Sequence, residues 1–161
     1  MRLTKVEKEE IKDILRAYLR DERVCEMKKY VQHGQISTFE HCKTVTKLSY
    51  YLNKRLHLHA NEKDLVKGAF LHDFYLYDWH DSSIKLPRLH GYFHPEAALK
   101  NAKKHFDVNE NVAKIIATHM WPLTLTKIPT SKEAVIVCLA DKYVSTVETL
   151  ACRKRKINII N

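Results

Sequence analysis

Glycine and proline are scarce in this chain, which carries three glycines and four prolines in 161 residues. A β-rich fold uses these residues in its many tight turns, whereas helix interiors exclude them. The composition therefore predicts an all-α protein. A chain of this length is most simply one domain, covering 1–161, and it can bury a substantial core.

Capping patterns and apolar spacing divide the chain into about six or seven helices. Apolar residues follow each N-cap pattern at steps of three and four, which is the spacing of one buried helix face. The caps are Thr4 with Glu7, Ser37 with Glu40, Asn61 and Asn109. We expect helices over about 5–20 and 22–31, the second with Val24, Met27 and Val31 facing inward. We expect other helices to begin after Ser37, after Asn61, at His94-Pro95, after Asn109 and near Ser131.

Two segments have no helical period and contain proline, so we predict loops at 79–93 and 122–130. The first is long for a compact domain, and long loops are often functional. It carries Lys85, Arg88 and His90, which could contact an anion. A solvated loop with no such role is the alternative.

The formal net charge of +9 indicates an anionic partner, either a phosphorylated small molecule or a nucleic acid. The four cysteines form no Cys-x-x-Cys pair, which is typical of free thiols in a reducing compartment. No apolar run reaches the length of a membrane span, and the first residues have no apolar signal core. We therefore expect a cytoplasmic protein without a membrane partner; a homo-oligomer remains open.

A set of histidines and aspartates occupies apolar stretches or helix ends, where a polar side chain is costly to bury without a partner. The set is His41, His72, Asp73, His94, His119 and Asp141. Taken singly, each has another interpretation: a core histidine bonded to a backbone carbonyl, a capping aspartate, or a buried salt bridge. Together, imidazoles with a few carboxylates suit iron, manganese, cobalt, nickel or zinc better than calcium.

The ordered pattern of these residues resembles the HD superfamily of metal-dependent phosphohydrolases. The resemblance covers 36–150 and leaves a short basic end at 151–161. The matching stretches are Glu40-His41, Leu71-His72-Asp73, His94-Pro95-Glu96, Thr118-His119 and Leu139-Ala140-Asp141-Lys142-Tyr143. The resemblance implies a helical fold and cleavage of a phosphoester, in a nucleotide or another phosphorylated small molecule, by metal-activated water.

The resemblance also implies roles for these residues. One metal would be held by His41, His72, Asp73 and Asp141, and Asp73 would bridge to a second metal held by His94 and His119. We expect two divalent transition-metal ions, with magnesium left open. His90 is a rival for the position of His94; Pro95, which fits the first position of a helix, favours His94.

Further roles beside the metals are hypotheses about charged and titratable side chains. Lys142, Arg88 or Lys85 could neutralise charge on the phosphoryl group, and His90 or Asp78 could protonate the leaving oxygen. The residues after the His-Asp pair, Phe74 to Asp78, lack the glycine and lysine of the superfamily's cyclic-dinucleotide branch, and no Gly-Tyr-Pro motif follows. A cyclic-dinucleotide substrate is therefore not expected.

Two other functions fit parts of the sequence. The first alternative is a non-catalytic HD-like module that binds a metal or a nucleotide and acts through a partner. The second is a basic nucleic-acid-binding protein, which the charge allows. The chain, however, has no zinc-finger spacing and no basic helix interleaved with aromatic residues. Turnover of phosphoesters separates the first alternative from an enzyme, and a steep salt dependence of binding identifies the second.

Overall fold

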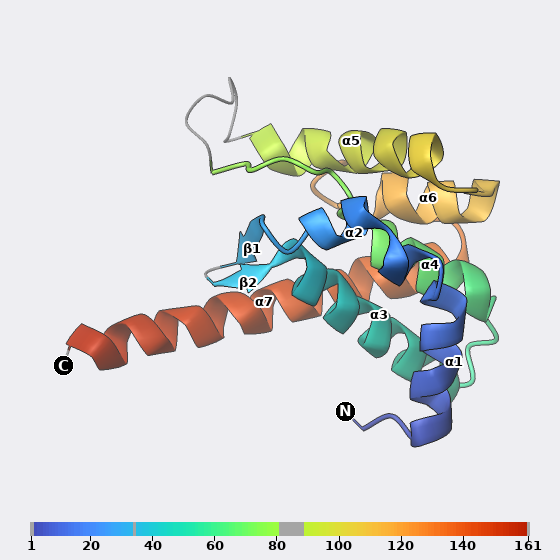
Figure 1. The fold of residues 1–161 in the computed structure, drawn as a ribbon, viewed down its shortest axis with the longest axis horizontal. Helices are drawn as coiled ribbons and strands as arrows, with labels where there is room; N and C mark the ends of the chain where they lie inside the picture. The colour runs from blue at the N-terminus through green and yellow to red at the C-terminus, as the bar shows by residue number, and fades with distance from the viewer. Residues whose placement is uncertain (1, 34, 81–88, 161) are drawn as a thin grey trace.

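The computed structural model of the chain describes residues 2–33, 35–80 and 89–160, with side chains for all of these except His33 and 154–160. Within these ranges it contains seven α-helices, one short 3-10 helix and one two-stranded hairpin (Figure 1). The prediction of an all-α fold is confirmed. No helix within the described part of the chain has the length and apolar character needed to cross a membrane.

The N-terminal region is more broken than its apolar spacing predicts. Helix α1, Lys5–Leu15, starts at the predicted capping box, in which the Thr4 hydroxyl accepts from the Glu7 N–H at 3.2 Å. The helix ends five residues before the predicted limit, and the 3-10 helix η1, Tyr18–Arg20, follows it. Helix α2, Glu22–Glu26, is capped by Asp21 and is also shorter than predicted.

A small hairpin begins at Val31, the last residue of the second predicted helix. Strand β1, Val31–His33, pairs antiparallel with β2, Ile36–Ser37. Val31 is 36% exposed, so its predicted inward position is wrong, whereas Val24 and Met27 are fully buried as predicted. Strands of two or three residues are too short for an alternating apolar pattern to be visible in the sequence.

The central helices begin where their caps predict. Helix α3, Thr38–Arg55, follows Ser37; α4, Glu62–Leu71, follows Asn61; and α6, Glu110–Thr118, follows Asn109. In each case the capping side chain accepts a hydrogen bond from a backbone N–H three residues later. Helix α3 packs against α4 and α7, and α6 packs against α4, α5 and α7.

Helix α5, His90–His105, begins four residues before the predicted start at His94. The loop prediction is therefore wrong at 90–93, while 81–88 lies outside the described residues. Pro95 falls in the second turn instead of the first position, where it removes one backbone hydrogen bond. Pro95 is buried, so packing offsets part of that loss.

Helix α7, Lys132–Ile160, is the longest element and crosses the molecule (Figure 1). Its C-terminal part extends beyond the other helices. The short basic end at 151–161 continues this helix as far as Ile160, and no glycine or proline interrupts the sequence there. The loop predicted at 122–130 is confirmed.

The helices enclose two neighbouring groups of buried apolar residues. One joins the N-terminal helices to α4, α5 and α6 through residues such as Phe70 and Phe74. The other joins α3, α4, α6 and α7 through residues such as Leu65 and Ile115. The polar residues predicted to form the site lie among these apolar groups, at the ends and inner faces of five helices.

Candidate metal centre

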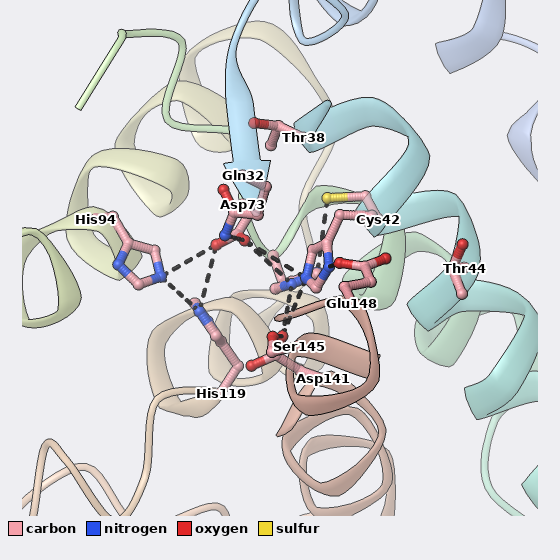
Figure 2. Close-up of polar contacts among 12 residues, drawn as sticks. Gln32, Thr38, Cys42, Thr44, Asp73, His94, His119, Asp141, Ser145 and Glu148 are labelled. Carbon is pink, nitrogen blue, oxygen red and sulfur yellow. Dashed lines mark hydrogen bonds and ion pairs between the residues drawn. The ribbon is translucent and has the colours of Figure 1, made fainter. Parts of the chain in front are cut away.

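All six predicted ligands are buried, with none more than 6% exposed. The elements α3 to α7 each contribute: His41 lies in the first turn of α3, His72 and Asp73 directly follow α4, His94 lies in α5, His119 follows α6, and Asp141 lies in α7. Figure 2 shows His94, His119 and Asp73 turned toward one another. The structure therefore brings together residues that are up to 100 positions apart, such as His41 and Asp141.

The two oxygens of Asp73 face different pairs of histidines. Oδ1 lies 3.0 Å from His94 Nε2 and 3.5 Å from His119 Nε2. Oδ2 lies 3.4 Å from His72 Nε2 and 3.9 Å from His41 Nε2. A carboxylate in this position can contribute one oxygen to each of two neighbouring cations.

Asp141 completes the half of the cluster that contains His41. Its Oδ1 lies 3.1 Å from His41 Nε2 and 3.7 Å from His72 Nε2, and it accepts from the Ser145 hydroxyl at 3.1 Å. Donor atoms of His41, His72 and Asp141 lie within 4.8 Å of one another, as do those of His72, Asp73 and His119. Each group is a set of donor atoms that could hold a cation, and the two groups share His72.

Every histidine of the cluster has its Nδ1 engaged by an acceptor outside the cluster. Carbonyls and carboxylates only accept hydrogen bonds, so each Nδ1 carries the proton and each Nε2 of a neutral ring presents a lone pair inward. The Nδ1–H of His72 donates to Ala69 O (2.8 Å), that of His94 to His90 O (2.9 Å) and that of His119 to Ile116 O (2.8 Å). The Nδ1–H of His41 donates to Glu148 Oε2 (2.8 Å). Three rings thus make the carbonyl bond of an ordinary core histidine while their second nitrogen faces the cluster.

The inward atoms fit a cation better than they fit one another. The Nε2 atoms of His94 and His119 lie 2.8 Å apart, where two lone pairs would repel. Within the described part of the chain, His72 Nε2 and Asp73 Oδ1 are buried and make no hydrogen bond of acceptable geometry, although each lies within 3.4 Å of an atom of opposite charge type. Buried polar atoms without partners are rare, and some of those that occur are ligands of a bound ion. Imidazole and carboxylate donors together suit a divalent transition metal.

The pKa values of Asp73 and His41 show how the buried carboxylates of the site and the nearby histidines affect one another. Burial alone would raise the pKa of Asp73, but His72 and His94 outweigh it and hold that pKa well below its usual range. Burial likewise opposes protonation of His41, but the carboxylates of Asp141 and Glu148 outweigh it and raise its pKa to about 10. Positive charge is therefore favoured on His41, whereas burial lowers the pKa of His119 and disfavours it there.

Two residues that form hydrogen bonds with the cluster were missed in the sequence. Glu148 follows Asp141 by seven residues, about two helical turns, so its position on the same face of α7 could have been predicted. Gln32 donates from Nε2 to Asp73 Oδ2 at 2.6 Å and lies in the unpredicted hairpin. Nothing in its sequence context marks it.

An open cavity of about 830 Å³ leads to the cluster. Trp79, Met120, Pro122 and Leu123 form an apolar part of its lining, and Ser145, Thr146 and Lys142 form a polar part. The Lys142 ammonium donates to the His119 carbonyl at 2.8 Å. Among the described residues that line the cavity, it is the only lysine or arginine.

The remaining predicted residues differ in their relation to the cavity. His90 lines it and stacks on His94, with 4.6 Å between ring centres, but its Nδ1 contacts the Tyr77 hydroxyl and it lies outside the ligand cluster. Burial, aided by the neighbouring His94, lowers the pKa of His90 to about 3, so its ring is neutral at neutral pH. Asp78 is exposed and does not line the cavity, and Arg88 and Lys85 lie outside the described residues.

Comparison with known proteins agrees with this arrangement. No curated protein and no solved structure matches the chain. The family model described as HD domain matches residues 38–146, which is more than half of the chain and includes all six clustered histidines and aspartates. The chain therefore belongs to the HD-domain family, a family of metal-dependent phosphohydrolase type.

Proposed function

We propose that the chain is an enzyme that hydrolyses a phosphoester with the help of two divalent transition-metal ions. The observation that carries this proposal is the inward orientation of four imidazole Nε2 atoms around two buried carboxylates, at the end of an open cavity. A purely structural polar cluster would not need an opening of this size.

The ligands divide between two positions according to the distances. His41, His72, Asp141 and one oxygen of Asp73 would hold the first ion. His94, His119 and the other oxygen of Asp73 would hold the second. When bound, such ions supply a water activated at neutral pH and neutralise charge on phosphoryl oxygens.

The residues of the chain would bind and orient the substrate. The Lys142 ammonium has three N–H groups; one donates to the His119 carbonyl and a second to Cys138 Sγ at 3.4 Å, so the third can donate to a phosphoryl oxygen in the cavity. The hydroxyls of Ser145 and Thr146 are further polar groups on the same helix. Ser145 also holds Asp141 in place through its 3.1 Å hydrogen bond.

The substrate proposed is a phosphorylated small molecule with an apolar or planar part, of the nucleotide type or similar. A cavity of about 830 Å³ lies within the range of small-molecule sites. Trp79 and Leu123 offer an apolar surface for the organic part, while the phosphoryl group would face the centre and Lys142. A neutral His90 can offer one hydrogen bond at this wall, but it is poorly suited to donate a proton to the leaving oxygen.

Metal content and hydrolysis, measured on the same preparation, test the proposal. Elemental analysis should find about two equivalents of a transition metal in protein purified without chelator or affinity-tag metal. With added Mn²⁺, the protein should hydrolyse at least one of a generic phosphodiester and a panel of nucleotides. Asp73→Asn should lose both properties, and Asp107→Asn, which makes the same change at an exposed loop residue, should keep both.

The other outcomes separate the alternatives. One equivalent of metal would support a mononuclear site at His41, His72, Asp73 and Asp141. Bound metal without hydrolysis across the panel would favour the non-catalytic regulatory module. No bound metal, even after reconstitution, would contradict the proposal and leave the cluster as a polar core.

A further inference from the structure

The hairpin formed by β1 and β2 places one side chain against the centre. Gln32, in the middle of β1, is 8% exposed and donates from Nε2 to Asp73 Oδ2 at 2.6 Å. In Figure 2 it lies directly beside Asp73. The hairpin precedes the segment that matches the HD-domain family, residues 38–146, so the family match does not account for this contact.

The oxygen of the Gln32 amide, on the side away from Asp73, is also hydrogen-bonded. The Tyr75 hydroxyl donates to Gln32 Oε1, and the Thr38 hydroxyl lies 3.0 Å from the same Tyr75 oxygen. A flipped amide would place its oxygen against the Asp73 carboxylate and its NH₂ against the Tyr75 hydroxyl. Since a carboxylate only accepts hydrogen bonds, Asp73 itself requires the amide nitrogen on its side, and the Tyr75 hydroxyl, which donates to Oε1, holds the amide in that orientation.

Gln32 acts on only one of the two Asp73 oxygens. Oδ2, which accepts its hydrogen bond, is the oxygen that faces His72 and His41, at 3.4 and 3.9 Å. Oδ1 faces the other two histidines of the cluster, at 3.0 and 3.5 Å. Gln32 is therefore the nearest partner of Oδ2, and the position of that oxygen depends on it. A carboxylate oxygen has two lone pairs, so one remains for an ion.

We propose that Gln32 is a positioning residue that orients Asp73 and thereby sets the affinity of the half of the centre formed by His41, His72 and Asp141. The inference rests on the proposed function, since it requires that the cluster bind metal. It adds a residue outside the matched family segment to the machinery, and it assigns that residue to one of two neighbouring ion positions.

Gln32→Met tests this role, because methionine keeps the length of the side chain and removes both the donor and the acceptor. Metal-free protein would be titrated with Mn²⁺. Calorimetry would give the affinity of each binding step, and electron paramagnetic resonance would give the stoichiometry. We expect one binding step to weaken by about 10- to 100-fold, the usual effect of losing a residue that orients a ligand, while the other changes much less. Gln35→Met, on the exposed turn of the same hairpin, is the matched control and should leave both steps unchanged.

A double-mutant cycle separates positioning from general loss of structure. Tyr75→Phe should weaken the same binding step by a smaller factor, because it frees the Gln32 amide to rotate. Adding Tyr75→Phe to Gln32→Met should then cause little further loss in that step. Additive losses, or losses of equal size in both binding steps, would show that the hairpin merely supports the fold and would overturn the inference.

The two proposals fail in different ways. Wild-type protein that binds no Mn²⁺ would contradict the proposed function, and this inference with it. Wild-type protein that binds Mn²⁺, together with a Gln32→Met variant that binds it equally well in both steps, would overturn this inference alone. The thermal unfolding of the metal-free variants, compared with Gln35→Met, identifies any variant that binds poorly only because it is unfolded.

Discussion

Replacing Glu148 by glutamine should weaken metal binding without unfolding the chain. Glu148 Oε2 accepts the Nδ1–H of His41 at 2.8 Å, and both residues are buried, at 8% and 0% exposure. Through this bond the carboxylate keeps the proton on Nδ1, raises the basicity of Nε2 and aims it at the cluster. The change to glutamine keeps the shape of the side chain and removes its charge.

The size of the effect follows from the strength of the hydrogen bond. A buried hydrogen bond to a charged group contributes about 1.5–3 kcal/mol, against about 0.5–1.5 kcal/mol for a neutral one. The difference of about 1–1.5 kcal/mol corresponds to a loss of roughly tenfold in affinity for the ion held by His41. Glu148→Ala should lose more, because it removes the acceptor that Glu148 provides to the buried His41 N–H, at a further cost of about 1–3 kcal/mol.

The assay is a titration of metal-free protein with Mn²⁺ or Zn²⁺, combined with thermal unfolding of the same samples. Glu9→Gln provides the same chemical change away from the site, at an exposed glutamate of α1 that pairs with Lys12. Wild-type affinity in Glu148→Gln would refute the reasoning, because it would mean that His41 does not depend on this carboxylate.

Three further predictions concern packing, acid stability and proton release. Gly68→Ala should destabilise the fold by about 1–3 kcal/mol in denaturant unfolding, since a Cβ there would lie 2.6 Å from Ile115 Cδ1. The destabilisation should be smaller in an Ile115→Ala background. A gain in stability would contradict this packing. Glu7, whose pKa is lowered to about 2 chiefly by its hydrogen bond with Arg55, contributes stability above its unfolded pKa near 4.5 that is lost as the pH falls toward 2. The stability difference between wild type and Glu7→Gln should therefore be present at pH 6 and vanish near pH 2, and a constant difference would argue against this ion pair. Because His41 has a pKa of about 10 in the metal-free chain, metal binding at pH 7–8 should release a proton, and the affinity should rise with pH. Calorimetry in buffers of different ionisation enthalpy would detect the released proton. An affinity that does not change with pH would contradict this prediction.

Much of the helical architecture could be predicted from the sequence because its signals are local. The caps at Thr4, Ser37, Asn61 and Asn109 begin helices where expected, since each side chain satisfies a backbone N–H within its own first turn. The start of α5 could not be predicted by the same rules. Pro95 indicated a first helical position, but its burial allows it in the second turn.

The six histidines and aspartates of the candidate site could be predicted from the sequence, but their geometry could not. His41, His119 and Asp141 are conspicuous because they interrupt apolar stretches, and the structure brings them into one cluster with the other three; metal binding by them stays a prediction. Gln32 gives no such signal, since a glutamine before a glycine-containing turn is ordinary. Its contact with Asp73 spans 41 residues and depends on tertiary structure alone.

The distribution of the cluster over α3, α4, α5, α6 and α7 has a consequence for the folding of the chain. Each of the two proposed ions would cross-link three helices, and because both positions include Asp73, the two ions together would connect all five. Anything that binds the native state and not the unfolded chain stabilises the fold, by about 2.7 kcal/mol when its free concentration is 100 times its dissociation constant. Supply of metal in the cell would then regulate the amount of folded protein as well as its activity.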